Sequence, residues 1–402
     1  MAHIAVIGAG QAGFSLVSKL RAEGFDGQIS LFGDEPVPPY QRPPLSKKYL
    51  TGEMDLQRLF FRPENFYEDQ GITLHLGRPV SAIDLAARTV TAGETHGFDQ
   101  LAITTGSLPR RLPDAIGGAL GGVHYVRSLA DVDAMEPAFR AGAKVLIVGG
   151  GYIGLEAAAV AAQRGLDVTL VEAADRILQR VAAPQTSDFF RKLHWDNGVT
   201  IMEGTGLASL TGDDRVTGAV LADGRELAVD FVIAGIGILP DTAIAEAAGL
   251  VCDNGIAVDA HCATSDPAVF AAGDCASFPH QGGRLRLESV GNAIDMGECV
   301  AMNMLGNSVS YTAKPWFWSD QYDTTLQIAG LNTGYDQIVE RPGARAGGMS
   351  VWYFAEGRLL AVDAASDPRS YMLGKRWIEA GVSPRAVDVE DASKELKTLD
   401  VS

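Results

Sequence analysis

Cysteine is scarce in this chain: only Cys252, Cys262, Cys275 and Cys299 occur, separated by 10, 13 and 24 positions. No two of them stand in the CxxC spacing by which zinc or iron–sulfur clusters are commonly held, so the sequence predicts no metal site. We interpret the four side chains as buried thiols, which pack as small apolar groups.

The chain also lacks a long apolar run and an excess of positive charge. No stretch approaches the roughly 20 consecutive apolar residues that span a bilayer, and the start MAHIAVIGAG enters a strand without a charged segment before it. The formal net charge of −17 repels phosphate backbones and anionic lipid heads. We therefore expect a cytoplasmic protein that binds neither nucleic acid nor a membrane.

What the sequence does contain is a pattern that occurs twice. Residues 3–8 (HIAVIG) form an apolar run ending in glycine, followed by a helical pattern and a second strand, QISLF, that ends at Phe32. The same order recurs over 144–171, with Gly8 and Gly149 standing 141 positions apart. Two β-α-β units in a chain of 402 residues predict two nucleotide sites in separate domains.

Each repeat continues with an apolar strand, at 98–106 and 229–237, and a helical stretch follows from about Asn292 to Leu305. PWFWSDQYD then opens a region of aromatic strand formers without a glycine loop. We predict an α/β fold with two Rossmann-like dinucleotide-binding domains and a C-terminal α+β domain. The predicted boundaries are 1–110 with 240–312 for the first domain, 111–239 for the second and 313–402 for the third.

The first glycine loop fits the GxGxxG pattern directly after a strand and at the start of a helix. Gly8 permits the tight turn, Gly10 lets the backbone approach a pyrophosphate, and Gly13 allows the helix to pack closely on the strand. Two acids follow the second strand, Asp34 and Glu35, and we choose Asp34 as the ligand of the ribose. The alternative is that both acids belong to a solvated turn.

The second loop carries Gly149, Gly151 and Gly154, and its second strand ends in Glu172. A carboxylate there accepts hydrogen bonds from ribose hydroxyls and repels a 2′-phosphate. The next two residues are alanines rather than the arginine expected for NADPH, so we predict NADH. Arg176 is close enough in sequence to keep NADPH open as the alternative.

Several segments resemble one family. They are GDEPVPPYQRPPLSK at 33–47, TTGSLPR at 104–110, AAGDCASF at 271–278, ESVGNAIDMG at 288–297 and PWFWSDQYD at 315–323. Over nearly its whole length the chain is similar to the FAD-dependent, NADH-linked ferredoxin reductases of bacterial oxygenases, which have the glutathione-reductase-like fold. The resemblance implies that the first loop binds FAD and the second binds NADH.

The resemblance also implies particular contacts. Those expected at FAD are Ala12, Asp34, Arg42, Lys47, Val80, Arg127, Gly273, Asp274, Val290 and Trp318. Those expected around the nicotinamide are Tyr152, Ile153, Ile236, Gly237 and Glu288. Lys47 and Glu156 resemble an ion pair of the family beside the reactive nitrogen of the flavin, which would make them the catalytic pair; the alternative is an ordinary salt bridge.

Disulfide reductases of this fold carry a redox-active CxxxxC after the first β-α-β unit, whereas this chain has Tyr40, Gln41, Arg42, Pro43 and Pro44 there. No thiol can receive electrons at that place. The resemblance therefore implies that electrons leave the flavin for a two-iron, two-sulfur ferredoxin that feeds a cytochrome monooxygenase or a ring-hydroxylating dioxygenase.

We expect the ferredoxin to dock near Trp318, Lys375 and Arg376, where cations cluster; a solvated basic helix is the alternative. Two other functions stay open. One is a reductase of the same fold that serves rubredoxin or a small molecule, and the other is a redox-sensing flavoprotein similar to apoptosis-inducing factors.

Overall fold

The computed structural model describes residues 2–402, which form two compact units. The first unit contains the chain up to Arg42, Met54–Leu108 and Ile238–Pro315, and the second contains Pro43–Glu53, Pro109–Gly237 and Trp316–Ser402. The C-terminal residues thus group with the second nucleotide-binding fold. The division of the chain into three domains, which the sequence suggested, stays a prediction.

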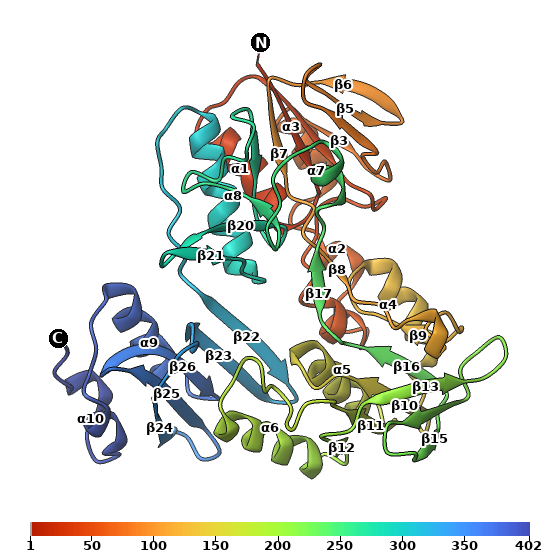
Figure 1. The fold of residues 1–402 in the computed structure, drawn as a ribbon, viewed down its shortest axis with the longest axis vertical. Helices are drawn as coiled ribbons and strands as arrows, with labels where there is room; N and C mark the ends of the chain where they lie inside the picture. Colours follow the sequence, from red (N-terminus) through yellow and green to blue (C-terminus); the bar gives the residue numbers. More distant parts are fainter. Residues whose placement is uncertain (1) are drawn as a thin grey trace. The chain divides into compact units, whose positions relative to one another are not determined.

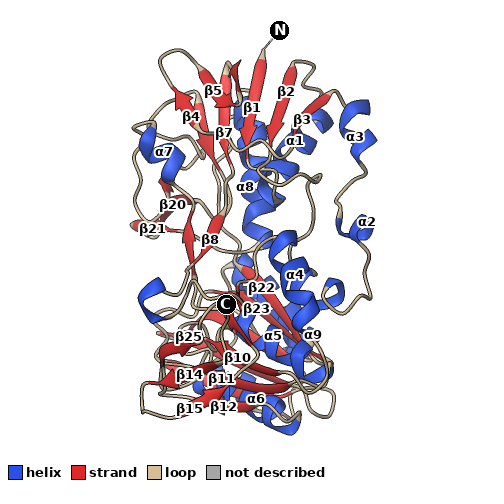
Figure 2. Cartoon of the chain, turned by 90° about the vertical axis from the view of Figure 1, so that its right-hand side faces the viewer, coloured by secondary structure: helices blue, strands red, loops and turns tan. Residues whose placement is uncertain are grey.

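The first unit is built on a parallel sheet in the order β19 (Val269–Ala271), β7 (Gln100–Ile103), β1 (His3–Ile7), β2 (Gln28–Phe32) and β3 (Ile72–His75). Figure 2 labels the last four of these strands. Branched side chains favour these strands, and Ile4 and Val6 of β1 are at most 1% exposed. Burial of whole strands is typical of parallel sheets, which helices cover.

Two helices of the first unit, α1 (Gln11–Ala22) and α8 (Val290–Met304), pack against each other (Figure 1). Leu16, Val17 and Leu20 form the buried stripe of α1, at the spacing expected for one helix face. The predicted β-α-β unit is confirmed, and the helix expected from about Asn292 begins at Val290.

Smaller elements complete the first unit. They are an antiparallel sheet of β4 (Ala82–Asp84), β5 (Thr89–Ala92) and β6 (Glu94–Gly97), a mixed sheet of β18 (Ile256–Ala257), β20 (Ala276–His280) and β21 (Gly283–Leu285), and the helices α2 (Leu56–Leu59), α3 (Glu64–Asp69) and α7 (Ala243–Ala247). Two short strands, β8 (Ser107–Pro109) and β17 (Ile238–Pro240), stand where the chain passes from one unit to the other.

The second unit contains the second predicted parallel sheet, in the order β12 (Thr200–Met202), β11 (Asp167–Val171), β10 (Lys144–Val148), β16 (Phe231–Ala234) and β9 (Val123–His124). Helix α5 (Tyr152–Gln163) follows β10 and is buried from Gly154 through Ala161, so it is apolar on nearly all sides. Further elements are α4 (Leu129–Met135), α6 (Pro184–Asp196) and an antiparallel sheet of β13 (Leu207–Thr211), β14 (Gly218–Leu221) and β15 (Glu226–Ala228).

The C-terminal part of the second unit is an antiparallel sheet in the order β22 (Trp316–Gln321), β23 (Thr324–Gly330), β26 (Arg358–Ala365), β25 (Met349–Ala355) and β24 (Gln337–Pro342). Helix α9 (Pro368–Ala380) packs on this sheet, and α10 (Ala386–Glu390) lies against β24 (Figure 1). Strand β22 is an edge strand, and it contacts α5. The predicted α+β character of the C-terminal region is confirmed.

Among residues 2–402, no helix combines the length and the apolar character needed to cross a bilayer.

Candidate cofactor-binding and active site

The first glycine loop leaves open space at one glycine and close contact at the other two. Gly8 has φ +110, and a Cβ atom there would lie 2.2 Å from the carbonyl oxygen of Thr104. A Cβ atom on Gly13 would lie 2.1 Å from the carbonyl oxygen of Gly8, whereas one on Gly10 would meet nothing within 4 Å. Gly10 is also the N-cap of α1 and provides no side-chain cap, so the first N–H groups of the helix are available to a phosphate.

The second loop repeats this arrangement. A Cβ atom on Gly149 would lie 2.4 Å from the carbonyl oxygen of Gly235, and one on Gly154 would lie 2.0 Å from that of Gly149. Gly151, the N-cap of α5, has no side-chain cap, and nothing lies within 4 Å of where its Cβ would be. Both loops therefore fit the pyrophosphate of a dinucleotide.

The acids after the two loops are held differently. The oxygens of Glu172 accept hydrogen bonds from the backbone N–H groups of Gly150 (2.6 Å) and Ala174 (2.8 Å), and a carboxylate retains further lone pairs for ribose hydroxyls. In the first unit Glu35 pairs with Arg42 at 2.7 Å, while Asp34 is exposed. Of the two candidate acids, Asp34 is thus the one directed to solvent.

Asp274 and Glu288 of the first unit are connected by a residue that the sequence did not single out. Asp274 accepts a hydrogen bond from the Ser107 hydroxyl at 3.0 Å. The guanidinium of Arg286 donates to the carbonyl oxygen of Asp274 at 3.2 Å and pairs with Glu288 at 2.7 Å. Glu288, expected near the nicotinamide, therefore lies in one polar group with the expected flavin ligand Asp274.

The other predicted residues of the first unit are Ala12 on α1, Val290 on α8, and Gly273 and Val80 in loops. Ala12 is buried in α1; Gly273 has φ +83, which favours glycine, and a Cβ atom there would lie 3.1 Å from the Ala12 Cβ. Val290 is the first residue of α8, and Val80 packs against the core of this unit.

Lys47 and Glu156 form the ion pair that the resemblance implied. The Nζ atom of Lys47 lies 3.0 Å from Oε1 of Glu156 and 3.5 Å from Oδ2 of Asp320. Lys47 belongs to the short π-helical segment Leu45–Tyr49, while Glu156 is the one acid in the buried part of α5. Burial raises the pKa of Glu156, and the nearby charge of Lys47 and hydrogen bonds from Ser319 and Ser46 act against that rise.

Strand β22 presents two different rows of side chains, because alternate residues of a strand face opposite ways. Phe317 packs against Tyr152 of α5 with ring centroids 4.5 Å apart, and Ser319 donates a hydrogen bond of 2.7 Å to Glu156. The other row contains Trp318, which stacks on Trp316 at 5.6 Å between ring centroids.

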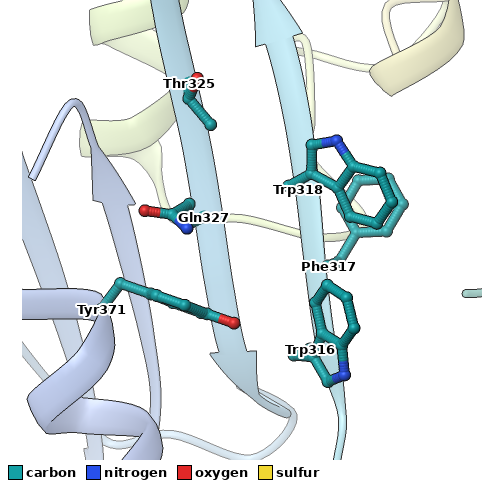
Figure 3. Close-up of a pocket in the computed structure, with 6 residues that line it drawn as sticks. All are labelled: Trp316, Phe317, Trp318, Thr325, Gln327 and Tyr371. Carbon is teal, nitrogen blue, oxygen red and sulfur yellow. The ribbon is translucent and has the colours of Figure 1, made fainter. Parts of the chain in front are cut away.

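The tryptophan row lines an open groove of about 290 Å³. Its walls come from β22, β23 and α9, and Figure 3 shows Tyr371 reaching toward it from α9. The lining residues are Trp316, Phe317, Trp318, Thr325, Gln327 and Tyr371. Trp318 and Tyr371 of α9, the helix that carries Lys375 and Arg376, thus line the same groove.

The remaining predicted residues of the second unit are Ile153 on α5, Ile236 and Gly237 after β16, and Arg127 before α4. Ile153 is 39% exposed at the start of α5, Gly237 has φ +103, and Ile236 packs at the edge of the core that contains β10 and β16. Arg127 is half-buried and directly precedes Ser128, the N-cap of α4. Lys47, Arg127 and Trp318 belong to this unit, and their contact with a flavin stays a prediction.

Sequence reasoning missed Ser46, Ser319, Asp320 and Arg286, each of which contacts a predicted site residue. A signal for two of them existed: Ser319 and Asp320 lie in PWFWSDQYD, whose alternation puts one on each face of the strand. All four cysteines are free thiols that lie after Leu250, and three of them are buried as predicted; the prediction is wrong for Cys252, which is only partly buried.

Comparisons with known proteins agree over nearly the whole chain. The family model for pyridine nucleotide-disulphide oxidoreductases matches residues 2–297, and the model described as a reductase C-terminal domain matches 316–400. A ferredoxin–NAD(P)(+) reductase from Sphingomonas sp is 43% identical, with 98% of this chain and 97% of the relative covered. Putidaredoxin reductase CamA from Pseudomonas putida is 40% identical, with 99% and 96% covered.

Among solved structures, the crystal structure of a covalent putidaredoxin reductase–putidaredoxin complex matches with a TM-score of 0.94 and 38% identity. The match covers 98% of this chain and 97% of the compared chain.

Proposed function

Because this chain belongs to the pyridine nucleotide-disulphide oxidoreductase family and, within it, to the bacterial ferredoxin reductases, we propose that it carries electrons from NADH through FAD to a two-iron, two-sulfur ferredoxin. As a member of that family it is an oxidoreductase that binds FAD and NAD(P). The observation that carries the proposal is the pair of glycine-capped helices, α1 and α5, each with an open space at the glycine where a pyrophosphate would lie.

Bound FAD would supply the ability to accept two electrons as a hydride and to release them singly. The chain's own residues bind and orient it. We assign the pyrophosphate to the N-terminus of α1, the adenosine ribose to Asp34 and the ribityl chain to Asp274, which Ser107 holds by a hydrogen bond of 3.0 Å. We also propose the Lys47–Glu156 ion pair as the catalytic pair, because a lysine cation beside the flavin would stabilise negative charge on the reduced ring.

NADH is favoured over NADPH by the way the loop after β11 is built. Glu172 keeps a carboxylate beside the second glycine loop through its bonds to Gly150 and Ala174. Arg176, the residue that kept NADPH open, donates a 2.6 Å hydrogen bond to the hydroxyl of Ser187. A 2′-phosphate would therefore meet the Glu172 carboxylate, while the Arg176 guanidinium is engaged elsewhere.

We place the ferredoxin on α9, beside the groove that contains Trp318. The exposed residues Arg369, Met372 and Arg376 follow the three- and four-residue spacing of one helix face, and Met372 is 68% exposed. Lys375 is paired with Glu379, so Arg376 is the stronger candidate of the two predicted docking cations. An acidic ferredoxin would be attracted by this local patch in spite of the overall charge. We propose a cytoplasmic location, where NADH is available.

The proposal is tested by measuring NADH oxidation with a panel of purified acceptors: several two-iron, two-sulfur ferredoxins, a rubredoxin and a quinone. We expect turnover with at least one ferredoxin and much slower turnover with the others. Fast turnover with rubredoxin or quinone, but with no ferredoxin, would show that the protein is a reductase of the same fold with a different acceptor. Tight NADH binding without turnover with any acceptor would favour a redox-sensing protein.

A further inference from the structure

A continuous chain of hydrogen bonds runs from Glu156 into the interior of the second unit. The Ser319 hydroxyl donates to Oε1 of Glu156 at 2.7 Å, and Nε2 of Gln321 donates to the Ser319 hydroxyl at 3.1 Å. The Gln321 oxygen lies 2.8 Å from Nε2 of His194. The chain ends at Tyr322, whose hydroxyl lies 3.1 Å from Nδ1 of His194.

The middle of this chain is sealed from solvent. Ser319, Gln321 and His194 are 0% exposed, and Glu156 is 7% exposed. Buried polar groups that lose their partners incur the full desolvation cost, so each of these bonds constrains the next. Four elements contribute: α5, β22, α6 and the turn after β22, where Tyr322 has φ +59.

The chemistry of the groups fixes the direction of every bond. An ionised Glu156 can only accept, so the single proton of the Ser319 hydroxyl points at it, and Ser319 must accept from the amide of Gln321. The Gln321 oxygen then faces His194, which must donate through Nε2–H. Burial lowers the pKa of His194 to about 4, so the ring is neutral with one N–H, and Nδ1 accepts from Tyr322.

All four bonds therefore point toward Glu156. Aligned dipoles of this kind stabilise negative charge at the end they point to, and burial of Glu156 creates the need for such stabilisation. The chain is not a proton path, because the amide of Gln321 does not readily pass a proton from His194 to Ser319. Its role is electrostatic.

We propose that Ser319, Gln321 and His194 are positioning residues that keep Glu156 ionised and thereby hold the Lys47 ammonium in its place beside Glu156. The proposal rests on the function above. The groups that face Glu156 are Lys47 and Ser46 from the π-helical segment and Ser319 from β22, and Lys47 also faces Asp320. His194 faces Gln321 and Tyr322.

The test measures the protonation of Glu156 directly, by infrared spectroscopy of the oxidised, FAD-loaded enzyme as pH is lowered. The carbonyl stretch of a protonated buried carboxyl is assigned to Glu156 by its absence from Glu156→Gln. The decisive pair of variants is His194→Leu and His194→Gln. Leucine removes the donor to Gln321 and lets its amide turn around, whereas glutamine keeps an N–H donor in that place.

We expect His194→Leu to move the midpoint of Glu156 protonation upward by roughly half a pH unit, although His194 does not contact Glu156, and His194→Gln to leave it near the parent value. Ser319→Ala, which removes one oxygen, should move it upward by about one unit, a tenfold change in the protonation equilibrium. Unchanged midpoints in both His194→Leu and Ser319→Ala would overturn the proposal.

If His194→Leu fails to retain FAD, Ser319→Ala with the conservative Ser319→Thr gives the same comparison. We expect threonine, which keeps the hydroxyl, to keep the parent midpoint. An equal shift in both Ser319 variants would assign a packing role and contradict the proposal. Neither NADH nor ferredoxin enters this measurement, so a failure of the proposed acceptor would be seen separately.

Discussion

At the level of single residues, the glycines of the two loops differ in what a side chain would meet. At Gly13 and Gly154 a backbone oxygen lies about 2 Å from where the Cβ of an alanine would be, so a methyl group there would force the helix away from its strand. Gly10 and Gly151 are open, with nothing within 4 Å of the Cβ position. A side chain at these two positions should leave the fold intact and fill only the space intended for a ligand.

We predict that Gly151→Ala raises KM for NADH at least tenfold, about 1.4 kcal/mol, with the FAD content unchanged. Gly10→Ala should instead weaken FAD retention, measured by flavin release on gel filtration. Each variant is the control for the other, because both add the same methyl group at the start of a helix. If the two effects were exchanged, the assignment of the loops would be wrong.

The preference for NADH gives a second prediction at this scale. The parent should use NADH at least tenfold better than NADPH in kcat/KM, and Glu172→Gln should narrow that ratio by improving KM for NADPH, since a neutral amide no longer repels a 2′-phosphate. Asp175→Asn removes an exposed charge from the same loop and is the matched control. If Asp175→Asn altered the ratio of kcat/KM for NADH and NADPH as much as Glu172→Gln does, the preference would come from the overall charge of the loop and not from Glu172.

At the level of elements, local patterns predicted the order of strands and helices but not the contacts between distant elements, and the contact of Lys47 with Glu156 was expected only from the resemblance to a family. The runs at β1, α1 and β2, and at β10, α5 and β11, carry their own periodicity and glycine caps. The hydrogen bond from Ser319 to Glu156 joins residues 163 positions apart, and no local sequence pattern predicts it. Likewise no sequence pattern distinguishes Arg286 from the other cations, and only the structure shows that it contacts both Asp274 and Glu288.

The contact between α6 and the C-terminal sheet was also invisible in the sequence. Asp363 of β26 is buried, accepts a hydrogen bond of 2.8 Å from Thr186 at the start of α6, and bonds to the Tyr353 hydroxyl. Tyr353 in turn accepts from the backbone N–H of Ala183 at 2.9 Å. Burial raises the pKa of Asp363 to about 6.

This buried acid predicts a pH dependence of stability. Because the folded pKa of Asp363 lies above that of the unfolded chain, the folded state binds the proton more tightly, and stability falls as pH rises from about 4 through 6. We expect the free energy of unfolding of the parent, relative to Asp363→Asn, to fall by about 2 kcal/mol between pH 4 and pH 7. Denaturant unfolding at both pH values measures it, and an equal pH dependence in both proteins would contradict the assignment.

At the level of the whole molecule, charge decides how a protein partner can approach. The net charge of −17 repels an acidic ferredoxin at long range. Physiological salt screens charges beyond about 8 Å, so the charges near the contact surface determine the attraction. The face of α9 with Arg369 and Arg376 supplies such a patch beside the groove of Trp318. Specific docking should therefore depend on a few cations.

We predict that Arg376→Glu raises KM for the ferredoxin about tenfold at low ionic strength, with a smaller effect at high salt, while reduction of the flavin by NADH is unchanged. Lys192→Glu on α6 is the control, since Lys192 is an exposed cation of the same unit, with a side chain 73% exposed. Equal effects of the two substitutions would indicate that only net charge matters.

The central claim, that this chain moves electrons outward from NADH to a ferredoxin, is tested most directly by a single turnover without oxygen. The yellow FAD-loaded protein is mixed with one equivalent of NADH and then with an oxidised two-iron, two-sulfur ferredoxin, while flavin and ferredoxin absorbance are followed together. The account predicts that the flavin bleaches with NADH and recovers its colour as the ferredoxin is reduced. Flavin that bleaches and stays bleached in the presence of every two-iron, two-sulfur ferredoxin supplied would contradict it.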